Sequence, residues 1–154
     1  MKRALIPGLA LIAATTVCAQ ERGAALYQAH CAVCHEQRGE GIPGFAPRLA
    51  GNLVERARGE AGRRYLAQLV VSGMMGPIVS GGEKFNDAMP PFAALSDEEI
   101  VAVVGHVLTR FNGLPDAAVI TPQDVAEARK RALAPNEVRR LRERPAINTK
   151  GGEG

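Results

Sequence analysis

The sequence predicts an all-α protein with one small β-hairpin, and three observations support this fold class. Helix-start signals followed by apolar stripes at helical spacing occur along the chain, most clearly from Ser96 onward. Residues 39–59 are rich in Gly and Pro, which indicates a loop. Residues 78–85 combine short apolar runs with a central Gly-Gly pair, the pattern of a hairpin. The length of 154 residues suits one domain with a modest core.

The first half of the chain is expected to form two helices and the hairpin. Residues 21–35 contain good helix formers, among them Ala24 and Leu26. Residues 61–72 place apolar side chains on one face at helical spacing, and Gly73 ends this helix. The hairpin that follows would close a loop.

The second half of the chain is expected to form further helices. Ser96 can cap the first of them, and the Glu three residues later can complete a capping box. Thr121-Pro122 starts the next helix by the same logic, and this helix runs to about residue 132. Residues 135–144 are expected to add one or two helical turns, and the Gly-rich end is predicted to be disordered.

The first 19 residues are typical of a secretory signal peptide. Lys2 and Arg3 precede an apolar run over residues 4–17, and a small-residue pattern then leads to Ala19. We expect cleavage after Ala19, which predicts a periplasmic protein whose mature chain has no transmembrane segment.

Two alternatives to cleavage fit these residues less well. A retained membrane anchor is disfavoured because the apolar run is shorter than the ~20 residues of a spanning helix and contains Pro7. Lipid attachment at Cys18 is disfavoured because Val17 is bulky for the position before a lipidated cysteine. The predicted regions are therefore a signal peptide at 1–19, a folded domain at 20–121 and a charged C-terminal extension at 122–154.

The charge of the chain is divided unevenly between these regions. The folded domain carries nine basic and eleven acidic side chains, whereas the extension carries eight basic and five acidic ones. The formal net charge of +3 is therefore a poor guide to partners, since the domain is mildly acidic. Such a distribution is not that of a nucleic-acid-binding protein.

Loss of the signal peptide would leave two cysteines, Cys31 and Cys34, in a C-x-x-C-H motif that ends with His35. On a helical turn the two thiols point the same way, so each sulfur can add to one vinyl group of a porphyrin. His35 would then lie under the ring, where an imidazole nitrogen can coordinate iron. The motif predicts one covalently bound haem c.

Three other interpretations of the two cysteines fit less well. A zinc site needs four ligands, and beyond the cysteines only His30, His35 and His106 offer N or S donors of the usual kind. A thioredoxin-like dithiol needs a βαβ context that this pattern does not supply. A plain disulfide would leave the role of His35 unexplained.

The second axial ligand of the iron decides between electron transfer and chemistry on a bound molecule. Met89 precedes Pro90-Pro91, which stiffen the backbone, so a thioether held there loses little further entropy on meeting iron. From spacing alone, Met89 is as well explained by a packing role in the core as by a role as the second ligand. The chain offers these candidates: Met74, Met75, Met89, His30 and His106. The Met74-Met75 pair is the runner-up, and His106 is expected to pack on its helix.

The chain resembles a class I cytochrome c over roughly residues 20–129, in several motifs that occur in the family's order. Residues 23–27 followed by C-x-x-C-H resemble the family's first helix and haem anchor. Pro47-Arg-Leu-Ala-Gly51 resembles the segment whose proline carbonyl accepts the N–H of the proximal histidine. The resemblance implies this role for Pro47 and a packing role on the haem for Leu49.

Residues 76–100 resemble the hairpin, methionine loop and last core helix of one subgroup of this family. This resemblance implies that Met89 is the second axial ligand beside His35 and that Phe92 lines the haem pocket. The cytochromes of the subgroup serve as subunits or domains of periplasmic dehydrogenases and other respiratory enzymes. One departure is Gly105-His106, which stands where the family commonly has an aromatic residue, so no ligand role is carried onto His106.

The resemblance implies an electron-transfer protein and not an enzyme. Its expected fold is that of a cytochrome c, with helices packed around the haem and a small β-hairpin before the methionine loop. Expected partners are redox proteins of the respiratory chain: a dehydrogenase, an oxidase or another cytochrome. The rival functions are a haem enzyme or gas sensor with Met89 displaced from iron, and a metal-free binding module.

The basic tail is the last feature of the sequence with a functional interpretation. It could dock an acidic partner or an anionic membrane, although a solvated face or a disordered end is the favoured interpretation. Its arginines are Arg139, Arg140, Arg142 and Arg144.

Overall fold

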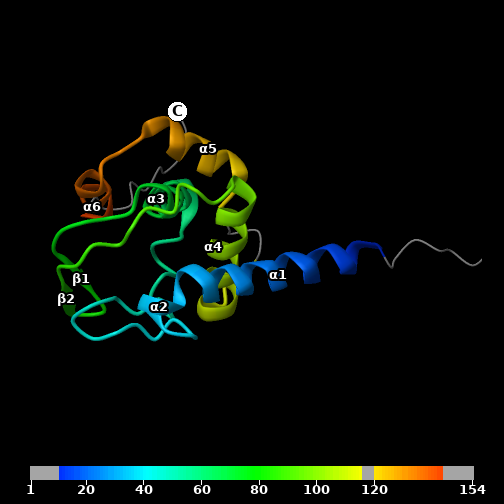
Figure 1. Ribbon diagram of the computed structural model, residues 1–154, viewed down its shortest axis with the longest axis horizontal. Helices are drawn as coiled ribbons and strands as arrows, with labels where there is room; N and C mark the ends of the chain where they lie inside the picture. The colour runs from blue at the N-terminus through cyan, green and yellow to red at the C-terminus, as the bar shows by residue number, and fades with distance from the viewer. Residues whose placement is uncertain (1–10, 116–119, 144–154) are drawn as a thin grey trace, which may run out of the picture.

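The computed structural model describes residues 11–115 and 120–143 (Figure 1). Most of the predicted signal peptide and the Gly-rich end lie outside the described residues, as does Arg144. Among the residues described, no helix is both long and apolar enough to cross a membrane.

Six helices and one two-stranded antiparallel sheet make up the described part of the chain. Their order along the chain is α1 (Leu11–His30), α2 (Ala32–His35), α3 (Gly59–Ser72), β1 (Ile78–Ser80), β2 (Glu83–Phe85), α4 (Asp97–Asn112), α5 (Pro122–Arg131) and α6 (Pro135–Glu143). The largely helical fold, the hairpin and the positions of α3, α4 and α5 agree with the sequence-based prediction. The capping boxes at Ser96 and Thr121 are both formed.

Two elements differ from the prediction. The helix expected over residues 21–35 is interrupted at Cys31, whose φ of −114° lies outside the helical range, so that α2 is a separate turn. The last helix, α6, lies within the predicted range of residues 135–144, but its nine residues form more than the one or two turns expected. Helix α1 also runs through Ala19, so the predicted cleavage point lies within it, and cleavage stays a prediction.

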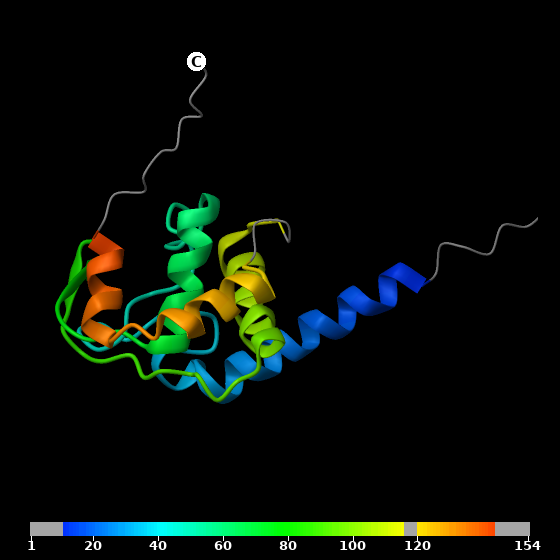
Figure 2. The same ribbon diagram turned by 90° about the horizontal axis from the view of Figure 1, so that it is seen from above.

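The crossing of α1 and α4 forms the base of the molecule, and the N-terminal part of α1 extends away from the other helices (Figures 1 and 2). Gly23 permits the close approach, because a Cβ on it would lie 2.4 Å from the carbonyl oxygen of Ala102. The ring of His106 lies 5.7 Å from that of Tyr27 and 5.1 Å from that of Phe111. His106 thus occupies the crossing as part of an aromatic cluster, in agreement with its expected packing role.

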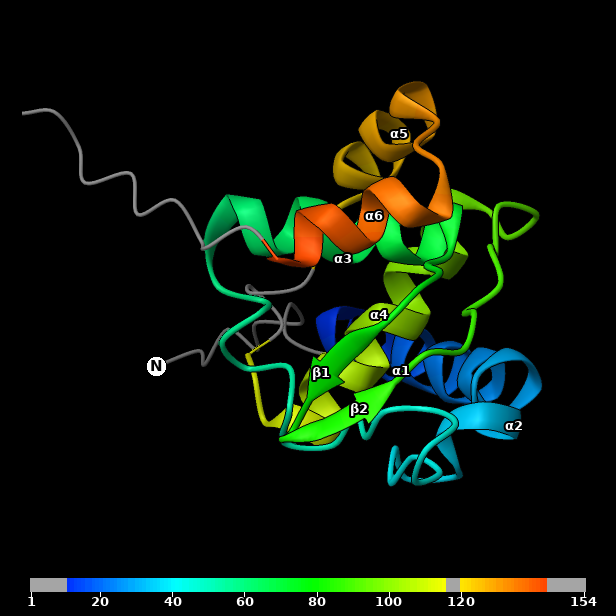
Figure 3. The same cartoon turned by 90° about the vertical axis from the view of Figure 1, so that its left-hand side faces the viewer.

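Helices α5 and α6 pack against the rest of the fold. Both lie along α3, and Figure 3 shows α6 beside α3 and above the hairpin. Val125 and Val138 are fully buried, and the side-chain amide of Gln68 on α3 donates to the carbonyl oxygen of Ala128 on α5 at 3.1 Å. The division into a domain at 20–121 and an extension stays a prediction.

Replacement of Gly23 by Ala is expected to destabilise the protein, although in an isolated helix Ala is more stabilising than Gly by about 1 kcal/mol. The added methyl meets the backbone of Ala102 and forces α1 and α4 apart, which costs about 1–3 kcal/mol. Thermal or denaturant unfolding measures this loss. As a control, Ala25→Val adds volume on the exposed side of the same helix and should have little effect on stability. A Gly23→Ala variant as stable as the wild type would contradict the close contact of α1 and α4 at Gly23.

Candidate haem site

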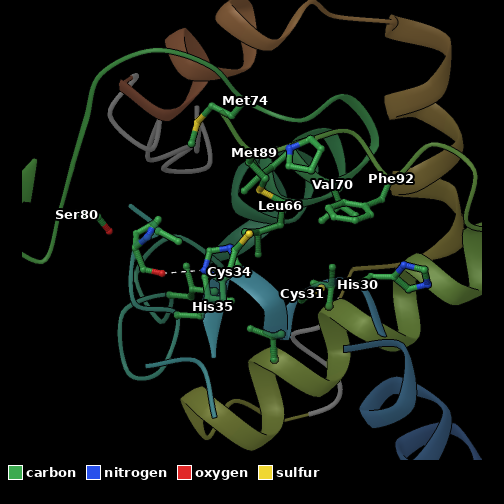
Figure 4. Close-up of a pocket in the computed structure, with 18 of the residues that line it drawn as sticks. His30, Cys31, Cys34, His35, Leu66, Val70, Met74, Ser80, Met89 and Phe92 are labelled. Carbon is green, nitrogen blue, oxygen red and sulfur yellow. Dashed lines mark hydrogen bonds between the residues drawn. The ribbon is translucent and has the colours of Figure 1, made fainter. Parts of the chain in front are cut away.

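An apolar cavity lies between the ends of α1 and α2, the body of α3, the loop around Met89, and α4 (Figure 4). Its walls are formed mainly by aliphatic and aromatic side chains, which are Leu49, Leu53, Leu66, Leu69, Val70, Ile78, Phe92, Val103, Val104, Val107 and Leu108 among others. A cavity of this composition excludes water from whatever it holds.

Both cysteines of the C-x-x-C-H motif line this cavity. The turn that carries them is closed by two bonds to the Cys31 carbonyl oxygen, from the N–H of Cys34 at 3.2 Å and from that of His35 at 2.9 Å. Burial, followed by the neighbouring Cys34, raises the pKa of the Cys31 thiol to about 11. Neither cysteine is in a disulfide, so both sulfurs are free to bond a ligand.

His35 lies between the cavity and the loop that follows α2. Its Nδ1 is 2.9 Å from the carbonyl oxygen of Pro47, and because a carbonyl only accepts, Nδ1 carries the proton and donates it. Nε2 is then the unprotonated nitrogen, the form that binds a metal. Burial lowers the pKa of His35, and the bond to Pro47 opposes this only in part, so the ring is held neutral.

The hydroxyl of Tyr27 fixes the turn that carries His35. It donates to the carbonyl oxygen of Glu36 at 2.7 Å and approaches that of His35 at 3.4 Å. Tyr27 is itself fully buried at the α1–α4 crossing, so the rigid core of the fold orients the end of α2.

The loop around Met89 is held to the end of α3 by backbone pairing. The N–H of Met74 donates to the carbonyl oxygen of Met89 at 3.0 Å, and the N–H of Met89 donates to that of Met74 at 2.8 Å. Gly73 permits this contact: its φ is +70°, and a Cβ there would lie 2.5 Å from the Met89 carbonyl oxygen. The N–H of Phe92 donates to the carbonyl oxygen of Val70 at 2.9 Å, which fixes the far end of the loop.

The structure brings the candidate second ligands into different positions. Met89 enters the cavity from the loop, whereas His35 enters from α2 (Figure 4). Met74 and His30 also line the cavity. Met75 is 53% exposed and is not among the lining residues, nor is His106.

Every site residue proposed from the sequence borders this one cavity: Cys31, Cys34, His35, Pro47, Leu49, Met89 and Phe92. Sequence reasoning did not assign a place there to Ser80 and Arg142. The apolar stripe of α3 was visible as a helix face, but nothing in its spacing distinguished contact with a cofactor from contact with another helix. Arg142 lies in the tail, whose position no sequence pattern indicated.

The residues fit a haem in the chemistry of their donor groups. Two free thiols, a neutral imidazole with one nitrogen available, and a thioether border the same water-excluding space. Thiols can bond the vinyl groups, and imidazole and thioether are ligands for haem iron.

Comparison with known proteins agrees with this geometry. A family model described as cytochrome C oxidase, cbb3-type, subunit III matches residues 19–107. The chain is 40% identical over 149 residues to a cytochrome c-552 of Thermus thermophilus, covering 95% of this chain and 94% of that protein. A second cytochrome c-552 of Thermus thermophilus is 40% identical over 134 residues, covering 85% of this chain and 100% of that protein.

A third relative is the cytochrome subunit of a fructose dehydrogenase from Gluconobacter japonicus. It is 32% identical over 100 residues, which cover 58% of this chain and 18% of that protein. The match therefore concerns only a small part of that subunit.

Removal of the Tyr27 hydroxyl is expected to change the alkaline stability of the protein. Burial raises the pKa of Tyr27 above its ordinary value of 10.0, so the folded state retains the phenol proton longer than the unfolded state. The resulting stabilisation is complete below pH 10 and decreases as pH rises through the folded pKa. For Tyr27→Phe, denaturant unfolding should give a free energy of unfolding about 1 kcal/mol lower than that of the wild type at neutral pH. Above pH 10 this free energy should fall less steeply with pH than that of the wild type. An alkaline decline as steep as that of the wild type would contradict this role.

Proposed function

This chain belongs to the class I cytochrome c family, and we propose that it carries single electrons between protein redox partners in the periplasm. It is an electron-carrying cytochrome with covalently bound haem c. The observation that carries the proposal is the convergence of two free cysteines, a neutral histidine and a loop-held methionine on one apolar cavity.

We assign the roles in the site as follows from the chemistry of each side chain. Cys31 and Cys34 would hold the porphyrin through thioether bonds to its vinyl groups, and His35 Nε2 and the Met89 sulfur would be the two protein ligands of the iron. The Pro47 carbonyl orients His35 and raises its basicity. Leu49 and Phe92 line the pocket around the ring.

When bound, the haem supplies an iron that alternates between the ferrous and ferric states. With both His35 and Met89 as ligands, the iron would have no position open for a substrate, which favours electron transfer over chemistry on a bound molecule. The Met thioether and the apolar walls both favour the ferrous state and raise the reduction potential. Tyr27 and the Met74–Met89 pairing hold the two ligands in place, so little reorganisation accompanies each electron.

Electrons would enter and leave where the cavity meets solvent. Val33 and Phe45 line the cavity but are 77% and 46% exposed, respectively. They mark an apolar opening next to the haem attachment site. A contact here would be small, as is typical of transient redox encounters.

The class of partner is proposed from the relatives. One relative is the cytochrome subunit of a dehydrogenase, and the matching family model is named for an oxidase subunit. We propose a dehydrogenase, an oxidase or another cytochrome of a respiratory chain as donor or acceptor, met in the periplasm after export by the predicted signal peptide.

The interpretation of the basic tail as a docking surface also stays a proposal. Among the described arginines of α6, Arg140 is exposed, whereas Arg139 and Arg142 are partly buried. Arg139 also pairs with Glu143. Docking through α6 would therefore depend mainly on Arg140.

Replacement of Met89 by Leu tests the assignment of the second ligand. The oxidised wild type should show the weak far-red band of thioether-to-ferric-iron charge transfer, and its reduced form should bind carbon monoxide poorly. Met89→Leu removes the sulfur at similar volume, so the band should disappear and carbon monoxide should bind, as absorption spectra would record.

Two matched variants serve as controls. Met75→Leu changes an exposed methionine outside the pocket and should keep the band. Met74→Leu changes the other methionine of the cavity. A band that survives in Met89→Leu and disappears in Met74→Leu would show that the ligand is Met74.

A further inference from the structure

Two arginines and a hydroxyl border the haem cavity away from the cysteines. Arg142 of α6, Arg48 and Ser80 all line the cavity, and Figure 4 shows Ser80 across the pocket from Cys31. The side-chain amide of Asn52 donates to the Ser80 hydroxyl oxygen at 2.8 Å, which leaves the Ser80 hydroxyl hydrogen available to another acceptor.

Helix α6 is anchored so that Arg142 has a defined position. Val138 is fully buried, and the N–H of Met75 donates to the carbonyl oxygen of Pro135 at 3.3 Å. The Arg142 guanidinium donates to the carbonyl oxygen of Val79 on β1 at 3.1 Å. The Arg56 guanidinium donates to the carbonyl oxygen of Arg142 at 3.3 Å. Arg142 is therefore tied to the hairpin at one end and to the loop before α3 at the other.

The charges around Arg142 are unbalanced. Arg56 and Arg142 are both partly buried, and burial, followed by the positive charge of Arg142, lowers the pKa of Arg56. Asp87, Glu143 and Lys84 border the adjacent surface pocket, and Asp87 also lines the haem cavity. The three cations Arg56, Arg142 and Lys84 there outnumber the two anions Asp87 and Glu143.

In the part of the chain that the structure describes, ion pairs within 4 Å are formed by other cations, and none involves Arg48, Arg56 or Arg142. Partly buried cations of like charge are costly without an anion between them. The position therefore suits an anionic group supplied from within the cavity.

The haem carries such a group in a fixed place. Its two propionate carboxylates lie on the edge of the porphyrin opposite the vinyl groups. Bonds from Cys31 and Cys34 to the vinyl groups would direct the carboxylates to the opposite side of the cavity, toward Ser80 (Figure 4). Arg142 also lines the cavity, and its guanidinium donates to the carbonyl oxygen of Val79, the residue before Ser80. A guanidinium is the side chain best suited to bind a carboxylate with two parallel hydrogen bonds.

We propose that Arg142, with Arg48 and the Ser80 hydroxyl, forms the binding site for the haem propionates, so that α6 is part of the cofactor site. This inference rests on the proposed attachment of the haem through Cys31 and Cys34. It assigns to the C-terminal helix a role in setting the reduction potential. A cation beside the carboxylates offsets their negative charge, which otherwise stabilises ferric iron.

Replacement of Arg142 by Gln in the full-length haem-loaded protein tests the proposal. The reduction potential should fall at low ionic strength, and a carboxylate band in the redox-induced infrared difference spectrum should shift. Arg142→Lys keeps the charge and should retain most of the potential, with a shifted band. Arg140→Gln removes the same charge from the exposed side of the same helix and should change neither the potential nor the band.

The outcomes separate this proposal from the haem site itself. A fall in thermal stability of Arg142→Gln with the potential and the carboxylate band unchanged would mean that Arg142 only anchors α6, and would overturn the proposal. Equal effects of Arg142→Gln and Arg140→Gln would also overturn it. If the proposed haem attachment or ligands were wrong, the wild-type protein itself would lack covalent haem or the far-red band.

Discussion

The structure depends on the space between α1, α3 and α4 being filled by a large apolar group. The chain has no Trp, two Tyr and four Phe, so its side chains alone make a thin core. Leu66 on α3 and Leu108 on α4 are buried, yet both border the cavity. A covalently bound haem completes this core, and apolar burial of such a surface contributes roughly 25 cal/mol per Å². The cofactor is therefore part of the fold as well as of the function.

The fold in turn positions the residues proposed to bind the haem, because the elements that carry them are fixed by their own contacts. His35 is set by the Pro47 carbonyl and by the Tyr27 hydroxyl below α2. Met89 is set by backbone pairing with Met74, which only a residue without Cβ at position 73 allows. Rigid placement of both proposed ligands would keep the geometry the same in both redox states, which suits a carrier of single electrons.

Local sequence signals predicted the parts of this protein that depend on local chemistry. The capping box at Ser96 predicted the start of α4. The C-x-x-C-H motif predicted a haem attachment site, and its residues line the cavity. Long-range placement was not predictable in this way. The break at Cys31, the pairing of Met74 with Met89 and the position of Arg142 beside the cavity arise from tertiary packing, which leaves no periodic trace in the sequence.

The most direct test of this account is mass spectrometry of the protein matured in its native host, with mapping of its peptides. The account predicts that the intact chain carries the mass of one haem after acid-acetone extraction and that the added mass lies on the peptide containing Cys31 and Cys34. A mature chain with the mass of the polypeptide alone, or a haem that extraction removes, would contradict it.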